Sequence, residues 1–327
     1  MRRRDFIILV GGAAIGWRSA AGAQPSDRIY RIGYLSLGDP AAEATRFDAF
    51  RAALAAQGYA EGKNIVIETR WLQGRNYDQL AALAIQLVDQ KADVIVTYST
   101  PGVAAAKRAT TTIPIVFASL GDAVAVGLVS SLARPGGNVT GTSYFIPELV
   151  AKRLELLKEA MPTLTKAGVL FNPANAATEP VLSAMRSTAR SLGIELAEFG
   201  ARDVNELEPV IAAMTAGSVR AFVVAEDPML IYNSKPIAKL ALANRLACCG
   251  FPELAQAGGF AAYGIDFVEL WRRAATFVGK LLKGARAEDL PVERATKFIT
   301  MINANAAKTI GIEVPTSLLL RADDVVD

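Results

Sequence analysis

The stretch ADVIVTYSTPGVAAAKRATTTIPIVFAS, residues 92–119, decides the fold class. It contains two apolar runs rich in β-branched residues, at 92–98 and 113–119, which are typical of buried strands. Between these runs, GVAAAKRAT at 102–110 predicts a helix. A strand, a helix and a second strand in this order predict a parallel sheet covered by helices on both faces.

The same alternation extends in both directions from this stretch. In the first half of the chain we expect strands at 31–37, 64–72 and 138–145, and helices at 45–58, 77–90 and around 125–133. The pattern then restarts, with strands expected at 166–172, 194–200, 219–227, 247–252, 259–264 and 297–303, and helices at 146–162, 177–193, 204–217, 231–246 and 266–284. The sequence therefore predicts an α/β protein with two similar, doubly wound parallel-sheet lobes.

Prolines suggest where the chain crosses between the lobes. Pro147 and Pro291 lie at the expected crossings. We expect the first lobe to contain residues 28–145 plus about 264–290. The second lobe is expected to contain 146–263 plus about 291–327, and a hinge is expected to join the two.

The first residues, MRRRDFIILVGGAAIGWRSAAGAQ, are typical of an export signal. A basic start precedes a ten-residue apolar run, Phe6 to Ile15, and small residues at 21–23 resemble a cleavage site. The run is shorter than the roughly 20 residues that a membrane span needs. Arg3-Arg4 followed by Asp5 favours a twin-arginine signal over a plain secretion signal. We therefore expect residues 1–23 to be removed and the protein to be located in the periplasm.

Charge and composition exclude several classes of function. The chain has 35 basic and 32 acidic residues, a net charge of +3, and residues 1–23 carry all of this excess. The remaining chain is neutral, so we expect no nucleic-acid partner. The absence of histidine removes histidine-based catalysis and most transition-metal sites. Cys248 and Cys249 are neighbours that we expect to be buried on a strand.

In an open parallel α/β sheet, ligands bind beyond the carboxyl ends of the strands. Residues at these ends are rich in hydroxyl, amide and aromatic groups, which suit a small ligand held by hydrogen bonds and apolar packing. The candidate ligand-binding residues are Ser36, Gly38, Tyr98, Ser99, Thr100, Ser119, Asp122, Ser143, Tyr144, Asn172, Asp227 and Tyr263.

Three of these candidates have an alternative structural role. Thr100 could cap the helix that Pro101 begins, or it could bind a ligand carboxylate at that helix N-terminus. Asp227 could accept a ligand ammonium or act as an N-cap before Pro228. Asp122 has the same two possible roles, and the sequence favours capping for it.

Motifs for catalysis are missing from the sequence. It contains no G-x-S-x-G, no Walker A motif, no G-x-G-x-x-G and no Cys/His ligand cluster. We therefore expect no metal site, and the missing motifs favour binding over catalysis. An exported two-lobed protein of this composition is more typical of a binding protein.

The sequence resembles the substrate-binding proteins of bacterial ABC transporters, in the group that includes tryptophan- and tyrosine-binding members. The resemblance runs from about Tyr30 to Asp324. The stretches that carry it are GYAEGKNIVIETR (58–70), ADVIVTYSTPGVAAAK (92–107), IPIVFASLGDAVAVGLVSSLARPGGNVTG (113–141), GVLFNP (168–173), AAYGIDF (261–267) and INANAAKTIGIEVP (302–315).

The resemblance implies a type I periplasmic-binding-protein fold that closes on a small molecule and delivers it to a membrane permease. It implies a protein with neither catalytic activity nor a cofactor, and we expect a monomer. Two departures bear on the ligand. Many relatives have Asp-Pro where this chain has Asp122-Ala123, and relatives that bind aromatic amino acids often carry His-Pro where this chain has LSLGDPAAEA (35–44). The resemblance therefore predicts an amino-acid-like or small carboxylate ligand, without identifying tryptophan.

Two other functions remain open on the sequence alone. The protein could be a ligand-binding module that feeds a sensor system. It could also be an exported enzyme that uses carboxylates, since Asp39, Asp122, Glu226 and Asp227 are expected near the cleft. A repressor of similar fold would need an N-terminal DNA-binding motif, where this chain has the expected export signal.

Overall fold

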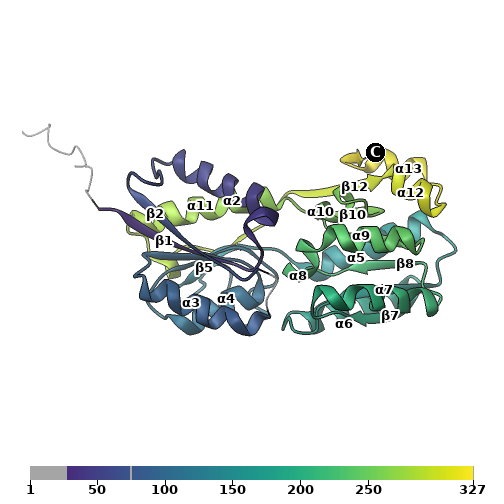
Figure 1. The fold of residues 1–327 in the computed structure, drawn as a ribbon, viewed down its shortest axis with the longest axis horizontal. Coiled ribbons are helices and arrows are strands. Elements are labelled where there is room, and N and C mark those ends of the chain that lie inside the picture. Colours follow the sequence, from purple (N-terminus) through teal and green to yellow (C-terminus); the bar gives the residue numbers. More distant parts are fainter. Residues whose placement is uncertain (1–27, 74–75, 327) are drawn as a thin grey trace, which may run out of the picture.

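The computed structural model describes residues 28–73 and 76–326, which form two α/β lobes side by side (Figure 1). The predicted export signal at 1–23 lies outside the described residues. Among the residues that the structure describes, no helix is long and apolar enough to span a membrane.

The first lobe is built on a six-stranded parallel sheet. In spatial order its strands are β2 (Ile65–Trp71), β1 (Tyr30–Ser36), β3 (Val94–Thr97), β4 (Ile115–Leu120), β5 (Val139–Ser143) and β11 (Glu293–Arg294). Every residue of β3, β4 and β5 is buried, as the apolar runs predict.

Helices cover both faces of this sheet (Figure 1). On one face α2 (Pro40–Ala55) packs against α11 (Phe267–Leu282), and on the other α3 (Leu80–Asp89) packs against α4 (Ser99–Ala109). Two short 3-10 turns, η1 (Tyr77–Gln79) and η3 (Ala287–Asp289), complete the lobe.

The second lobe repeats this architecture around a seven-stranded sheet. In spatial order its strands are β7 (Glu195–Gly200), β6 (Lys166–Phe171), β8 (Ala221–Val224), β9 (Ala247–Gly250), β10 (Ala261–Ile265), β12 (Phe298–Asn303) and β13 (Asp324–Val326). All neighbouring strands are parallel except β10 and β12, which are antiparallel.

Helices also cover both faces of the second sheet. Its helical segments are α5 (Ile146–Ala160), α6 (Thr178–Ser191), η2 (Val204–Glu206), α7 (Leu207–Ala216), α8 (Pro228–Tyr232), α9 (Ser234–Ala243), α10 (Pro252–Gln256), α12 (Ala304–Ile310) and α13 (Thr316–Arg321). The pair α5 and α6 packs together, and α9 packs against both α7 and α10.

Three short connections join the lobes. They are residues 144–145 between β5 and α5, Asp266 between β10 and α11, and residues 295–297 between β11 and β12. The first lies just before Pro147, which occupies the first turn of α5. The third lies beyond the expected boundary near 290, because Glu293 and Arg294 pair with Thr142 and Ser143 in the first sheet.

The helix expected around 125–133 is wrong, because this segment forms turns. Gly127 has a φ of +69°, which a right-handed helix does not allow. The backbone N–H groups of Leu128 and Val129 both donate to the carbonyl oxygen of Ala123, at 3.0 and 3.2 Å. Asp122 caps the first turn by accepting from the backbone N–H of Val124 (3.2 Å), so its predicted capping role is confirmed for a turn rather than a helix.

Candidate functional site

The strand order of both sheets reverses at equivalent positions. In the first sheet β2 and β3 flank β1, and in the second sheet β7 and β8 flank β6. Such a reversal leaves a crevice at the carboxyl ends of the strands, because the helices that follow the neighbouring strands diverge. The crevice of the first lobe lies after β1 and β3, and that of the second lobe lies after β6 and β8.

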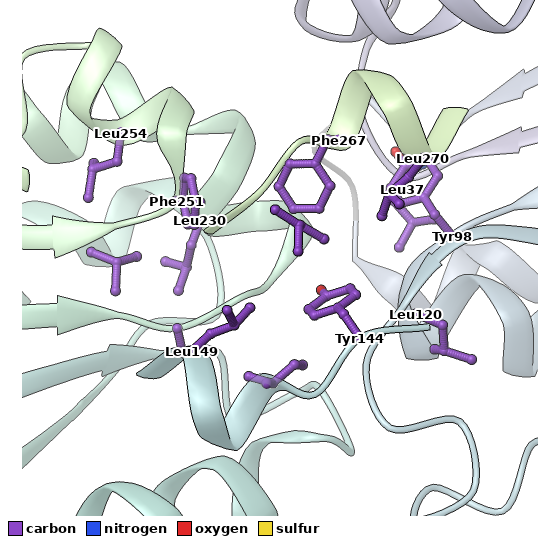
Figure 2. Packing of buried hydrophobic residues seen from close by; sticks show 14 of the residues in the cluster. Leu37, Tyr98, Leu120, Tyr144, Leu149, Leu230, Phe251, Leu254, Phe267 and Leu270 are labelled. Atoms are coloured by element: carbon purple, nitrogen blue, oxygen red, sulfur yellow. Dashed lines mark hydrogen bonds between the residues drawn. The ribbon is translucent and has the colours of Figure 1, made fainter. Parts of the chain in front are cut away.

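Residues from both crevices line one cavity between the lobes, which we call the inter-lobe cavity. Its lining residues are Arg46, Tyr98, Ser99, Ser119, Tyr144, Glu226, Asp227, Pro228, Ile231, Tyr232, Phe267 and Trp271. In this arrangement of the lobes the cavity is narrow, with a volume of about 20 Å³. Figure 2 shows Tyr144 and Phe267 between Tyr98 on the first-lobe side and Leu230 and Phe251 on the second-lobe side.

Arg46 brings a buried positive charge to this cavity from α2. Only 6% of the residue is exposed, and its guanidinium forms an ion pair with Glu253 of the second lobe. The guanidinium carbon also lies 4.5 Å from the ring centre of Phe267 and 5.4 Å from that of Trp271. Both geometries are within the range of cation–π attraction, so aromatic rings hold the arginine in place.

A buried carboxylate supports the first-lobe side of the cavity. Glu43 is fully buried on α2 and accepts hydrogen bonds from the hydroxyl groups of Tyr34, Ser36 and Tyr98. Burial raises the pKa of Glu43, and the hydrogen bonds from Ser36 and Tyr34 partly oppose this shift. The Tyr98 hydroxyl also lies 2.7 Å from the hydroxyl of Tyr232, which belongs to the second lobe.

A second buried carboxylate, Asp227, supports the opposite side. It caps α8 by accepting from the backbone N–H of Met229 (2.9 Å), and it accepts from the side-chain amides of Asn172 (3.0 Å) and Asn175 (2.9 Å). The hydroxyl of Tyr77, in the first lobe, donates to it at 2.9 Å. Burial raises the pKa of Asp227, while these donors lower it. Asp227 therefore has the capping role that the sequence left open.

The N-terminus of α4 opens into the cavity through Ser99. Ser99 has a φ of +59°, a left-handed conformation that is uncommon for residues other than glycine and often marks a functional site. The N-cap is Tyr98, whose side chain makes no capping hydrogen bond, and Thr100 is already helical. The interpretation of Thr100 as the cap is therefore wrong, because the helix begins one residue before it.

The twelve sequence candidates fall into three groups. Those that line the inter-lobe cavity are Tyr98, Ser99, Ser119, Tyr144 and Asp227. Gly38 and Asn172 line a neighbouring outer crevice between the lobes. The residues that line neither are Ser36, Thr100, Asp122, Ser143 and Tyr263.

Three residues of the third group make structural contacts instead. Ser36 donates to Glu43, and Ser143 donates to the carbonyl oxygen of Gly121 at 3.1 Å. Tyr263 stacks on Phe298, with ring centres 6.0 Å apart.

Several cavity residues were missed because helices carry them. Arg46 lies on α2, Tyr232 on α8, and Phe267 and Trp271 on α11, whereas the strand-end rule points only to residues that follow strands. One signal was present in the sequence. The residues of α2 that become buried are Glu43, Arg46, Phe50 and Leu54, so two charged residues continue an apolar helical stripe.

Within residues 28–73 and 76–326, no group of three or more His, Cys, Asp or Glu side chains could hold a metal ion. Cys248 and Cys249 are buried, and burial raises the pKa of the Cys248 thiol to about 11 and of the Cys249 thiol to about 12. These thiols are therefore poor nucleophiles at neutral pH.

Comparison with known proteins gives consistent matches over nearly the whole chain. The family model described as ABC transporter substrate binding protein matches residues 37–326. A tyrosine-binding protein of Clostridioides difficile (strain R20291) is 29% identical over 265 residues, which cover 81% of this chain and 76% of that protein. A crystal structure of a conserved domain protein from Vibrio cholerae is 29% identical, with a TM-score of 0.85 over 91% of this chain and all of that one.

Two further structures differ in how well they match. A domain from Streptococcus pneumonia in complex with L-Trp is 25% identical and gives a TM-score of 0.84, covering 91% of this chain and all of that one. The ligand-free, open structure of a substrate-binding protein from Clostridium difficile is 28% identical but gives a TM-score of only 0.65, covering 91% of this chain and 99% of that one. At similar identity and coverage, this chain therefore superposes better on the L-Trp complex than on the open structure.

Proposed function

Because the chain belongs to the family of ABC transporter substrate-binding proteins, we propose that it captures one amino-acid-like or small carboxylate ligand between its lobes and delivers it to a membrane permease. The observation that carries this proposal is the inter-lobe cavity, to which both lobes contribute polar and aromatic side chains. Both halves of the cavity come from one chain, so we propose that it acts as a monomer.

The cavity has the chemistry that such a ligand requires. Arg46 and the N-terminus of α4 at Ser99 offer positive charge for a carboxylate, and Glu226 and Asp227 offer negative charge. Five aromatic rings, those of Tyr98, Tyr144, Tyr232, Phe267 and Trp271, provide apolar walls. Relatives named for tyrosine binding or solved with L-Trp support an aromatic amino acid as the first candidate.

Capture follows from motion of the lobes about the three connections. A ligand that contacts both lobes favours the closed arrangement, because only that arrangement offers all of its contacts at once. The permease then recognises the closed lobes and receives the ligand. We place this activity in the periplasm, to which the segment at 1–23 would direct the chain.

A thermal-shift screen of the mature protein with the twenty amino acids, aromatic acids and purines tests this proposal. Ligand at about 100 times its Kd adds about 2.7 kcal/mol to the free energy of unfolding, so the hit should raise Tm by a few degrees. The bound compound should be recovered unchanged. No shift with any compound contradicts the proposal, and conversion of the compound favours the enzyme alternative.

A further inference from the structure

Glu226 presents a buried carboxylate oxygen without a hydrogen-bond donor. Its side chain is 2% exposed, and its Oε1 forms an ion pair with Arg153. Its Oε2 has no partner among the described residues. A buried acceptor without a donor is costly, so a ligand that donates a hydrogen bond to it would be stabilised.

Arg153 contacts only one of the two carboxylate oxygens of Glu226. The fully buried guanidinium donates from Nε to the carbonyl oxygen of Tyr263 at 2.7 Å and from Nη1 to that of Val224 at 2.9 Å, while Nη2 contacts Glu226 Oε1. The arginine is held on three sides and fixes the orientation of Glu226. The second oxygen is thereby left for another partner.

The neighbouring carboxylate is a poorer candidate for ligand binding. Both oxygens of Asp227 already accept hydrogen bonds, from Tyr77 and Met229 and from the amides of Asn172 and Asn175. A ligand donor at Asp227 would have to displace one of them. Of these two consecutive carboxylates, only Glu226 has an unused acceptor.

Glu226 belongs to the lining of the inter-lobe cavity, together with Tyr144 and Ser119. Burial and then the charge of Glu226 raise the pKa of the Tyr144 hydroxyl, which agrees with a carboxylate on the cavity side. Figure 2 shows the Tyr144 ring in the space between the lobes. The charged residues in the lining are one arginine, Arg46, and two carboxylates, Glu226 and Asp227.

We propose that Glu226 Oε2 accepts a hydrogen bond from the ammonium group of the ligand, so that the substrate class is a free zwitterionic amino acid rather than a simple carboxylate. This inference rests on the proposed capture function. The ligand carboxylate lies toward the uncapped N-terminus of α4 at Ser99 and toward Arg46, at the first-lobe side. The side chain of the amino acid packs against the aromatic rings of the cavity.

Calorimetry with matched pairs of ligands tests the proposal on the unmodified mature protein. The probes are L-tryptophan, L-tyrosine and L-phenylalanine, each paired with the acid that lacks only the amino group: indole-3-propionate, 3-(4-hydroxyphenyl)propionate and 3-phenylpropionate. The amino acid that binds should bind about 10- to 100-fold more tightly than its paired acid, the effect of one hydrogen bond to a charged group.

Variants then assign this preference to one residue. Glu226→Gln should weaken binding of the amino acid by about 10- to 100-fold and change binding of the paired acid about twofold or less. Glu253→Gln is the matched control, because Glu253 also has a buried oxygen without a partner but does not line the cavity. It should affect both members of a pair equally.

The possible outcomes separate this inference from the proposed function. Equal affinity for an amino acid and its paired acid overturns the assignment of Glu226 and leaves capture intact. Absence of binding by every probe and by every compound of the thermal-shift screen overturns both. If Glu226→Gln does not fold, as judged by circular dichroism, the comparison of paired ligands on the unmodified protein still tests whether the ligand ammonium group is recognised.

Discussion

The two sides of the cleft each bury a glutamate, but they hold it differently. In the first lobe, Glu43 uses both oxygens to accept from the uncharged hydroxyl groups of Tyr34, Ser36 and Tyr98. In the second lobe, Glu226 has one charged donor, Arg153, on one oxygen and none on the other. A saturated carboxylate supports the architecture around it, whereas a half-saturated one is available to a ligand.

Removing the charged donor from the second lobe should have the largest effect. Arg153→Met leaves Glu226 buried without a counter-charge, and we expect the free energy of unfolding to fall by about 3–5 kcal/mol. Urea unfolding monitored by tryptophan fluorescence measures this loss. The double variant Arg153→Met with Glu226→Gln should recover part of it. If the double variant is no more stable than the single one, an unpaired Glu226 is not the cause.

Loss of the hydrogen bond between Tyr77 and Asp227, which joins the two sides of the cleft, should have a smaller effect. Tyr77→Phe removes the hydroxyl that donates across the cleft to Asp227, at a cost of about 1 kcal/mol in the closed arrangement. We expect the Kd of the amino acid found by calorimetry to rise roughly fivefold. Tyr30→Phe is the control, because Tyr30 packs on Tyr59 in the first lobe, away from the cavity. Equal Kd values for the Tyr77→Phe and Tyr30→Phe variants would count against a role of Tyr77 in closure.

A pH dependence at Glu43 should be the smallest effect, because three hydroxyl donors offset much of the cost of burying its charge. Burial raises the pKa of Glu43 in the folded state, so the folded protein binds this proton more tightly than the unfolded chain. Stability from this group is therefore fully present below the ordinary glutamate pKa and is lost as pH rises through the raised value.

Comparison with Glu43→Gln isolates this contribution, because the other titrating groups are common to both proteins. The free energy of unfolding of the unmodified protein, relative to the variant, should be higher at about pH 4 than at about pH 8. Urea unfolding at both values measures the difference. If the free energy of unfolding of the unmodified protein, relative to the variant, were instead higher at high pH, the folded state would stabilise the ionised form of Glu43.

The sequence predicted most of the fold because the strands are buried on both faces. Apolar runs such as 94–97 and 115–120 can hardly be anything other than strands of a covered parallel sheet. The two-residue strand at Glu293–Arg294 could not be foreseen, since its pairing with β5 depends on tertiary position alone. The segment at 125–133 was apolar enough for a helix, but Gly127 turns the chain there.

For the site, the sequence predicted strand-end residues better than helix residues. Tyr98, Ser99, Ser119 and Tyr144 follow from the rule that ligands bind beyond the strands. Trp271 reaches the cavity because α11 packs beside α2. The indole N–H of Trp271 also donates a hydrogen bond to the Tyr34 hydroxyl at 2.6 Å. The different bonding of Glu226 and Asp227 was also beyond sequence reasoning, because it depends on which donors surround each carboxylate.

The shortness of the three connections limits how the lobes can move. None contains more than three residues between the elements it joins, and the third is fastened to the first sheet by β11. Such tethers permit rotation about an axis near the connections but leave little freedom for one lobe to slide along the other. Opening of the cleft can therefore be described by a single angle. The outer rim, where Asp78 and Asp203 line the crevice from opposite lobes, should travel much farther than residues near Asp266.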